Sequence, residues 1–245
     1  MRHINEFLFI CSEADTREEL LTGFGRLLEQ YNFKFFIFFK RSQDDVDDLG
    51  TPLGEKLPEG WRDYYHSRKY PLIDPTRKML ASSHRPFRWQ NSVGPFKPTA
   101  YRKRIARLFQ DSARYGMTDG YVFPIHGRGG LLGSVWIAGE PGDMAPSELA
   151  LFDAATRATF WRLLELSQDD AATLDMPLPP EIRLTQREMD ILILLSKGMT
   201  SPEMGKELSI SSHTVDWYIN GIQRKLHARN RQHAIALAFR YGLIS

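Results

Sequence analysis

Apolar residues recur at helical spacing along much of the chain and run without interruption in a few short stretches. The helical spacing predicts helices over residues 5–14, 16–31, 60–68, 76–82, 99–115 and 146–167. Continuous aromatic and β-branched runs predict strands at 33–40, 120–126 and 131–139, with a short extended piece at Arg88 and Trp89. The acidic, Gly- and Pro-rich segment 42–60 is predicted to be mostly loop.

The last two predicted strands are joined by the sequence GRGG, which is typical of a β-hairpin. Helices that flank an antiparallel sheet make this part of the chain α+β, with an α-β-α sandwich as the predicted architecture. Periodicity is then lost over 168–180, where acidic residues and three prolines indicate a linker. We therefore predict a first domain over 1–167 and a second domain over 181–245.

The second domain contains the start signals of three helices. TQRE at 185–188 and TSPE at 200–203 are capping-box sequences, and Ser211 is the predicted cap of a third helix. A fourth helix is predicted over 231–239. A short helix, a tight turn and a longer helix with a polar outer face form a helix-turn-helix, whose second helix can enter the major groove of DNA. This domain is therefore predicted to be all-α, with four helices.

Residues 184–245 resemble a known family along their whole length. LTxRE, then Gly198, ISxxTV, KL and a closing GLI is the pattern of the LuxR-type DNA-binding domain. The chain departs from the family at Gly205, Asp216 and Tyr218, where Ala, a basic residue and His are common. These departures leave the operator sequence unpredictable. The alternative, a helical bundle that binds nothing, fits this match poorly.

The third helix of this domain would supply the contacts to DNA. Helix positions after Ser211 put one set of side chains near the groove and two basic ones toward the backbone: Thr214, Asp216, Trp217 and Asn220, then Arg224 and Lys225. Asn220 can bond adenine with two hydrogen bonds, and Asp216 can accept from cytosine or orient a basic neighbour. From Glu181 onward the chain has nine basic and six acidic residues, a modest positive excess.

Aromatic residues with polar tips gather between residues 61 and 89. Trp61 and Tyr65 are four residues apart and share one helix face, and Tyr70 and Trp89 follow. Asp74 adds a carboxylate acceptor. Such groups suit a small ligand with carbonyl oxygens and an amide N–H. From spacing alone an ordinary aromatic core with satisfied polar tips remains an alternative.

This constellation also resembles a known domain. WxxxYxxxxYxxxDP, a Trp after a further fifteen residues, and GxxxPIHGxxGxxG at 120–133 are similar to the autoinducer-binding domain of LuxR-type quorum-sensing regulators. The resemblance implies that an acyl-homoserine lactone binds here. Trp61 would donate to the lactone carbonyl, Tyr65 would bond the acyl carbonyl, Asp74 would accept from the amide and Trp89 would pack on the lactone ring. It also implies a dimer on a dyad-symmetric operator in double-stranded DNA.

Trp136 lies on the strand after the GRGG turn, where many members of that family carry Ser or Thr. Strand alternation puts it on the same face as Ser134. If this face borders the ligand, an aromatic wall replaces a hydroxyl and favours a short, branched or aryl acyl group over a long straight one. The alternative is a Trp packed on the helix-covered side of the sheet.

Composition narrows the class of protein further. The chain is 42% apolar and 25% charged with a net charge of +2, as in ordinary globular proteins. No apolar run reaches the ~20 residues that span a bilayer, and no secretory cleavage site follows the N-terminus. A single cysteine, Cys11, excludes a disulfide framework and suits a reducing cytoplasm. We expect a cytoplasmic protein with no membrane partner.

Enzyme chemistry is not supported by any motif. The seven histidines are scattered without an HxH or HExxH pair, which disfavours a metal site and a lactone hydrolase. There is no GxSxG elbow or P-loop, and the alternating βα units of a phosphorylated response regulator are missing. We expect no catalytic residue and no cofactor apart from the small ligand. An orphan regulator that senses a non-lactone molecule is the main alternative.

Overall fold

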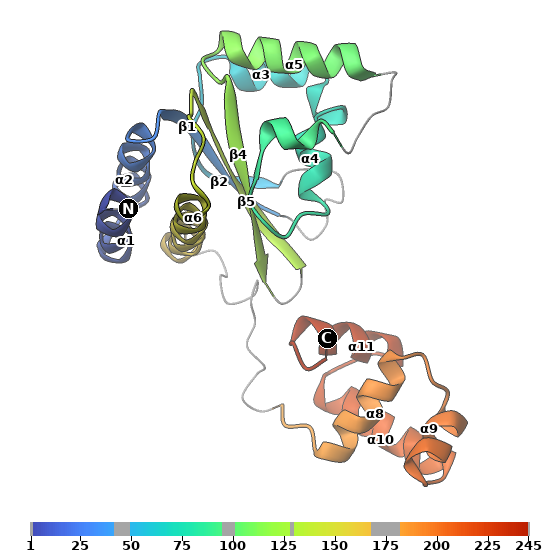
Figure 1. Ribbon diagram of the computed structural model, residues 1–245. Coiled ribbons are helices and arrows are strands. Elements are labelled where there is room, and N and C mark those ends of the chain that lie inside the picture. Colours follow the sequence, from blue (N-terminus) through green and yellow to red (C-terminus); the bar gives the residue numbers. More distant parts are fainter. Residues whose placement is uncertain (1, 42–49, 95–100, 128–129, 168–181, 245) are drawn as a thin grey trace. The chain divides into compact units, whose positions relative to one another are not determined.

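The structure is a computed structural model that describes residues 2–41, 50–94, 101–127, 130–167 and 182–244. The chain divides into two compact units, one built from elements α1 to α6 and one from α8 to α11 (Figure 1). The predicted linker lies in 168–181, outside the described residues. The domain bounds at its two ends therefore stay predictions.

A five-stranded sheet forms the centre of the first unit. Its strands are β1 (Phe33–Lys40), β2 (Thr51–Lys56), β3 (Phe87–Arg88), β4 (Asp119–Gly127) and β5 (Gly130–Gly139). They lie in the order β2-β1-β5-β4-β3, and the described pairings β1–β2, β1–β5 and β3–β4 are antiparallel. The neighbouring positions of β4 and β5 confirm the hairpin that the two apolar runs predict.

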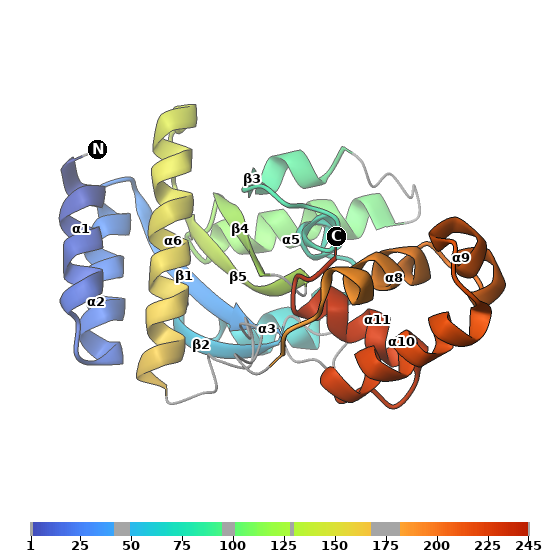
Figure 2. The ribbon, with the colours of Figure 1, turned by 90° about the horizontal axis from the view of Figure 1, so that it is seen from below.

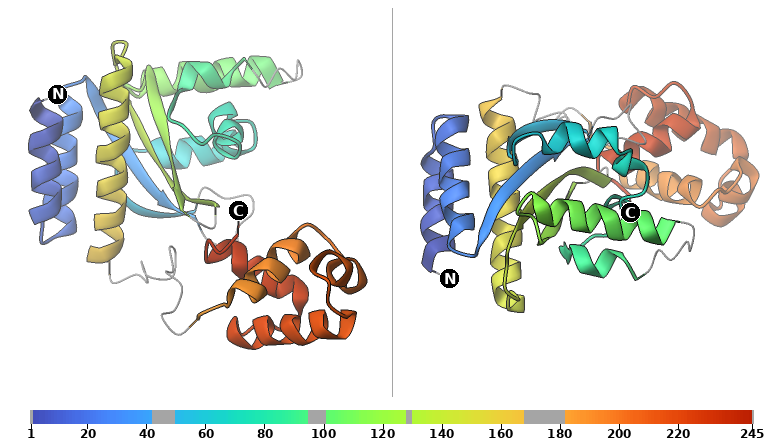
Figure 3. Two further views of the ribbon diagram at one scale, coloured as in Figure 1. Left: turned by 60° about the horizontal axis from the view of Figure 1, so that its bottom comes forward. Right: turned by 90° about the horizontal axis from the view of Figure 1, so that it is seen from above.

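Helices cover both faces of this sheet (Figures 1 and 2). One face carries α1 (Arg2–Glu13), α2 (Arg17–Glu29) and α6 (Pro146–Leu166). The other carries α3 (Trp61–Ser67), α4 (Pro75–Leu80) and α5 (Arg102–Arg114), with the 3-10 turns η1 (Tyr70–Leu72) and η2 (Trp89–Ser92). Figure 3 shows the same three layers from two further sides. The predicted α+β sandwich is confirmed.

The position of strand β1 inside the sheet explains why most of its residues are aromatic. The rings of Phe36 and Phe38 meet the ring of Phe24 edge-on from α2, with centroids 5.2 and 5.0 Å away. Phe35 and Phe39 point to the opposite face of the sheet and line a cavity there. A strand that is covered on both faces loses the alternation of polar and apolar residues.

The prediction that 42–60 is mostly loop is wrong for Thr51–Lys56, which form the edge strand β2. Its sequence, TPLGEK, carries Pro52 and Gly54, residues that are depleted in strands. Only Leu53 is fully buried. An edge strand tolerates a proline, and a Cβ on Gly54 would lie 2.8 Å from the side chain of Leu21. Residues 42–49 of that segment lie outside the described residues.

The second unit consists of α8 (Gln186–Ser196), α9 (Ser201–Leu208), α10 (Ser212–Lys225) and α11 (Arg231–Arg240). The predicted caps are present: the backbone N–H of Thr185 donates to Glu188 at 2.7 Å, and the N–H of Thr214 donates to Ser211 at 3.1 Å. Gly198 follows α8 with φ of 80°. The predicted four-helix helix-turn-helix domain is confirmed.

The turn between α9 and α10 is tight. Ser209 has a φ of 54°, in the left-handed region. A Cβ on Gly205 would lie 2.7 Å from the carbonyl oxygen of Ile210, so glycine at this departure from the family pattern suits the close approach.

In neither unit does a described helix have the length and hydropathy to cross a membrane.

Candidate functional site

A cavity of about 380 Å³ lies between the sheet and the helices α3, α4 and α5. Ligand pockets in proteins start at roughly this size. Its wall is mainly apolar and rich in aromatic rings, and its polar lining includes Arg62, Asp74, Thr76, Arg77 and Ser112. The cavity brings together five of the six residues predicted to bind ligand: Trp61, Tyr65, Asp74, Trp89 and Trp136.

Asp74 is the central polar group of the cavity and is only 6% exposed. It caps α4, accepting the backbone N–H of Thr76 at 2.9 Å, and accepts the Tyr65 hydroxyl on its other oxygen at 2.7 Å. Burial raises the pKa of Asp74, and hydrogen bonds from Thr76 and Tyr65 act against that rise. Burial and the Asp74 charge hold the pKa of Tyr65 well above its usual range. The Tyr65 hydroxyl therefore stays protonated and can donate a hydrogen bond.

Two tryptophans form further parts of the wall. The Trp61 ring stacks on Tyr64 with centroids 6.2 Å apart and lies 5.7 Å from the Tyr65 ring. The Trp89 ring packs so closely on β4 that a Cβ at Gly120 would lie 2.7 Å from its indole Cε2. Its indole N–H is buried and meets no acceptor among the described residues. A bound molecule with a nearby acceptor would remove that deficit.

Trp136 faces the cavity and not helix α6. It lies opposite Ile37 in the β1–β5 pairing, and its indole N–H donates to the hydroxyl of Ser134 at 2.9 Å. On the other side of the sheet, a Cβ at Gly133 would lie 2.5 Å from the ring of Phe160 in α6. Since the N–H of Trp136 is already used, the cavity meets an apolar ring at this position.

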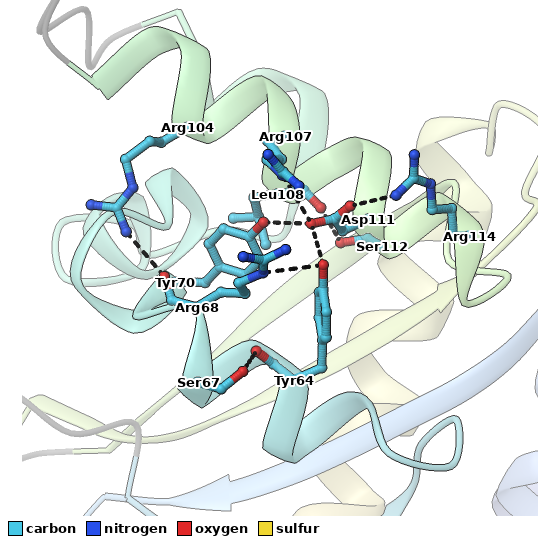
Figure 4. Close-up of polar contacts among 10 residues, drawn as sticks. All are labelled: Tyr64, Ser67, Arg68, Tyr70, Arg104, Arg107, Leu108, Asp111, Ser112 and Arg114. Atoms are coloured by element: carbon cyan, nitrogen blue, oxygen red, sulfur yellow. Dashed lines mark hydrogen bonds and ion pairs between the residues drawn. The ribbon is translucent and has the colours of Figure 1, made fainter.

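Tyr70 departs from the sequence prediction. It is not among the residues that line the cavity, and its hydroxyl donates to Asp111 at 2.6 Å (Figure 4). The helical spacing from Trp61 does not extend to it because Lys69 has a φ of 55° and turns the chain into η1. Thr76, Arg77 and the cavity-facing residues of β1 also line the cavity, although the sequence pattern did not indicate them. For β1 the uniform run of apolar residues hid which side faces the cavity.

The exposed face of α10 forms a single stripe in the second unit. His213, Trp217, Asn220 and Arg224 are exposed and follow one another at intervals of four and three residues. Trp217 is 64% exposed, which is unusual for so large an apolar side chain. The opposite face is buried in the core of the unit. Three of the predicted DNA-binding residues, Trp217, Asn220 and Arg224, therefore share one solvent-facing stripe.

Both units match family models: residues 16–163 match "Autoinducer binding domain", and residues 183–238 match "Bacterial regulatory proteins, luxR family". The chain belongs to the LuxR family. It is 27% identical to the transcriptional activator protein BjaR1 of Bradyrhizobium diazoefficiens, over 94% of this chain and 90% of that one. It is 28% identical to the transcriptional activator protein SolR of Ralstonia nicotianae, over 94% of each.

Solved structures share the fold of this LuxR-family chain. The crystal structure of Escherichia coli SdiA matches with a TM-score of 0.56 and 21% identity, over 99% of this chain and 98% of that one. SdiA in complex with octanoyl-rac-glycerol matches with a TM-score of 0.54 and 20% identity, over 98% and 94%. The described residues contain no group of three or more His, Cys, Asp or Glu side chains placed to hold a metal ion.

Thr214 and Asp216, two of the predicted DNA contacts, have partners within the LuxR-type domain. The Thr214 hydroxyl lies 2.8 Å from that of Ser211. Asp216 accepts the Ser201 hydroxyl at 2.6 Å and lies 3.5 Å from Arg231 Nη2, as expected if it orients a basic neighbour.

Lys225 was predicted to face the DNA backbone, and its position argues against that role. Its Nζ lies 2.7 Å from Glu188 Oε2 and 3.1 Å from the carbonyl oxygen of Arg183. It is adjacent to Arg224 in sequence but roughly 100° further round the helix. Lys225 therefore ties the end of α10 to the start of α8.

Proposed function

We propose that this LuxR-family chain is a quorum-sensing regulator whose cavity binds an acyl-homoserine lactone. The observation that carries the proposal is the Tyr65–Asp74 pair, a donor and a carboxylate side by side in an aromatic cavity. A secondary amide supplies the complementary pair, an N–H for Asp74 and a carbonyl for Tyr65. On binding, both residues exchange their mutual hydrogen bond for bonds to the ligand, and no buried group is left unpaired. Trp61 and Trp89 would contact the lactone ring.

We also propose how the chain binds DNA. Two copies of the chain would bind a dyad-symmetric operator as a homodimer in the cytoplasm, with α10 in the major groove of each half-site. The exposed stripe of Trp217, Asn220 and Arg224 supports this role. Of the two basic residues predicted to face the DNA backbone, Arg224 is kept as the proposed phosphate contact and Lys225 is not, because Lys225 is bonded to Glu188.

The second candidate is a regulator of the same architecture that senses a non-lactone acyl compound. SdiA, which shares the fold, has been solved in complex with octanoyl-rac-glycerol. That molecule has hydroxyl donors and an ester carbonyl, so it offers the Tyr65–Asp74 pair both kinds of partner. A lactone hydrolase is a distant third, since the similar proteins reported above are transcriptional activators.

Mass spectrometry of the purified protein separates these candidates. The chain would be produced in cells fed an equal mixture of acyl-homoserine lactones and octanoyl-rac-glycerol, and the bound molecules would be extracted. We expect one intact lactone, close to one per chain. Recovery of the glycerol ester alone would favour the non-lactone regulator, and recovery of opened lactones that accumulate with time would favour the hydrolase.

Asn220→Ala and Arg224→Ala should affect DNA binding in different ways. Loss of Asn220 should cost roughly 1–3 kcal/mol on the best operator and little on random DNA, because the side chain reads a base edge. Loss of Arg224 should weaken all sequences alike and reduce the salt dependence, because the contact is to phosphate. Fluorescence anisotropy at several salt concentrations measures both. Identical behaviour of the two variants across sequences would show that these roles are misassigned.

Trp136→Ser should change the preference for the acyl chain. The substitution removes an apolar wall beside Ile37 and frees space for further methylenes, each worth about 0.8 kcal/mol when buried. We expect wild type to prefer short, branched or aryl lactones and the variant to accept longer straight chains while binding the native ligand more weakly. Titration with lactones from butanoyl to dodecanoyl tests this. A wild-type optimum at dodecanoyl, or an unaltered preference in the variant, would contradict it.

A further inference from the structure

A buried carboxylate lies behind the cavity wall without touching the cavity. Asp111 on α5 is 2% exposed and accepts two phenol hydroxyls, from Tyr70 at 2.6 Å and from Tyr64 at 2.9 Å (Figure 4). Arg114 Nη1 lies 3.2 Å from its other oxygen, and Arg107 Nε lies 3.8 Å away. The hydrogen bond from Tyr70 is the main reason that the pKa of Asp111 is lowered, so the group is a charged acceptor. None of Asp111, Tyr64 and Tyr70 lines the cavity.

Tyr64 connects this carboxylate to the first polar ligand-binding residue. Its hydroxyl is fixed on Asp111, and its ring stacks on Trp61 at an interplanar angle of 29°. The Trp61 ring also lies 5.7 Å from the ring of Tyr65 and 5.1 Å from the ring of Tyr115. The orientation of the Trp61 indole therefore depends on where Asp111 holds Tyr64.

Tyr70 connects the same carboxylate to the second ligand-binding group. Its side chain ends on Asp111, while its backbone carbonyl accepts the N–H of Asp74 at 2.9 Å. Its ring also lies 6.0 Å from that of Tyr65, which donates to Asp74. The position of the Asp74 carboxylate is thus set through the residue that the sequence predicted to touch the ligand.

The wall that Asp111 holds has little stability of its own. It consists of α3, η1 and α4, with 7, 3 and 6 residues. Helices this short do not persist without tertiary contacts. Besides the Asp111 bonds, Arg104 Nη2 on α5 donates to the carbonyl oxygen of Arg68 at 3.0 Å. Every one of these polar contacts joins the short segment to α5.

We infer that Asp111, through Tyr64 and Tyr70, is the positioning residue that sets Trp61 and Asp74 for ligand recognition. The inference rests on the proposed function only in that the cavity takes a ligand with a polar head group. The hydrogen bonds of Asp111 position Trp61 and Asp74, which would contact the polar head group, and they do not position Trp136 beside the acyl chain. Loss of these bonds therefore lowers the affinity for ligands of every acyl chain by one common factor.

Tyr70→Phe and Tyr64→Phe test this in the full chain. Each variant removes one hydroxyl bonded to a charged group. We expect the dissociation constants of butanoyl-, isovaleryl- and cinnamoyl-homoserine lactone to rise alike, by about tenfold or more. Amides of residues 61–74 should exchange with deuterium at least tenfold faster without ligand, while those of α6 stay as in wild type. Tyr64→Phe serves where Tyr70→Phe does not fold, because Tyr64 is only partly buried.

Tyr31→Phe is the matched control. Its ring packs edge-on against Phe152 of α6, with centroids 4.8 Å apart on the other side of the sheet. It should leave both affinity and exchange over 61–74 unchanged. Unchanged exchange over 61–74 in the Tyr70 and Tyr64 variants, or losses that differ strongly between acyl chains, would overturn the inference. If wild type binds octanoyl-rac-glycerol and no lactone, the proposed function fails, and the same exchange and affinity measurements with that ligand still decide the inference.

Discussion

Asp74→Asn should remove most of the thermal stabilisation that a cognate acyl-homoserine lactone gives to this protein. A ligand that binds only the folded state stabilises it by about 2.7 kcal/mol at a hundredfold excess over its dissociation constant. Asparagine keeps the size of the side chain and its ability to cap α4, but it loses the charged acceptor for the amide. A hydrogen bond to a charged group is worth roughly 1.5–3 kcal/mol, so the same lactone concentration should stabilise the variant by only about 0.3–1.3 kcal/mol.

Differential scanning fluorimetry with and without lactone measures this difference. Asp119→Asn is the control, because Asp119 is also a buried carboxylate but pairs with Arg88 away from the lining of the cavity. It should lower the melting temperature of the free protein and keep the increment from ligand. The role of Asp74 would be refuted by an increment in Asp74→Asn equal to that of wild type. No increment in wild type with any lactone would favour the non-lactone regulator.

Glu188→Gln should destabilise the DNA-binding unit by about 1–2 kcal/mol. Glutamine can still serve in a capping box, so the start of α8 is retained. The Glu188 carboxylate is only 8% exposed and lies 2.7 Å from Lys225 Nζ. The variant removes its negative charge and leaves the Lys225 ammonium without an ionic partner at this position. In a unit of this size, 1 kcal/mol shifts the melting temperature by about 4–8 °C. Thermal unfolding followed by hydrogen exchange of peptides within 186–240 reports on this unit alone.

The difference from wild type should depend on pH in a defined direction. Burial acts to raise the pKa of Glu188, but the hydrogen bonds from Lys225 and Thr185 and the charge of Lys225 together outweigh it, and the pKa lies below the ordinary 4.5. Stability from such a carboxylate is present above pH 4.5 and is lost as the pH falls through the folded-state pKa. Wild type and Glu188→Gln should therefore converge in acid. Glu203→Gln is the matched control: Glu203 has the same capping role on α9 but is exposed, and its variant should unfold close to wild type.

The sequence predicts the elements that have strong periodicity and the residues that share one element. Trp61 and Tyr65 lie four apart on one helix, and the structure has both in the cavity. Strand alternation likewise predicts that Trp136 and Ser134 share a face, and the two are hydrogen-bonded. The sequence pattern did not predict strand β2, because an edge strand with one buried residue needs little of the usual strand composition.

Contacts between elements could not be predicted from spacing. Tyr70 meets Asp111 across 41 residues of sequence, and Lys225 meets Glu188 across 37. A periodic pattern indicates which side of a helix is buried, but it does not identify the partner on the neighbouring element. The sequence therefore predicted a ligand-binding role for Tyr70 and a DNA-backbone contact for Lys225, whereas each holds two elements of its own unit together.

The hydrogen bond between Tyr65 and Asp74 has a consequence for which compounds in a cell can act as signals. A molecule that offers only a carbonyl, such as a simple ester, would separate the pair and leave the buried carboxylate without its tyrosine. A free fatty acid at neutral pH would bring a second negative charge beside Asp74. Both are opposed by the cost of an unpaired or crowded buried charge. In the proposed sensor this hydrogen bond would select against the abundant acyl compounds of metabolism and would admit those that carry both a donor and an acceptor.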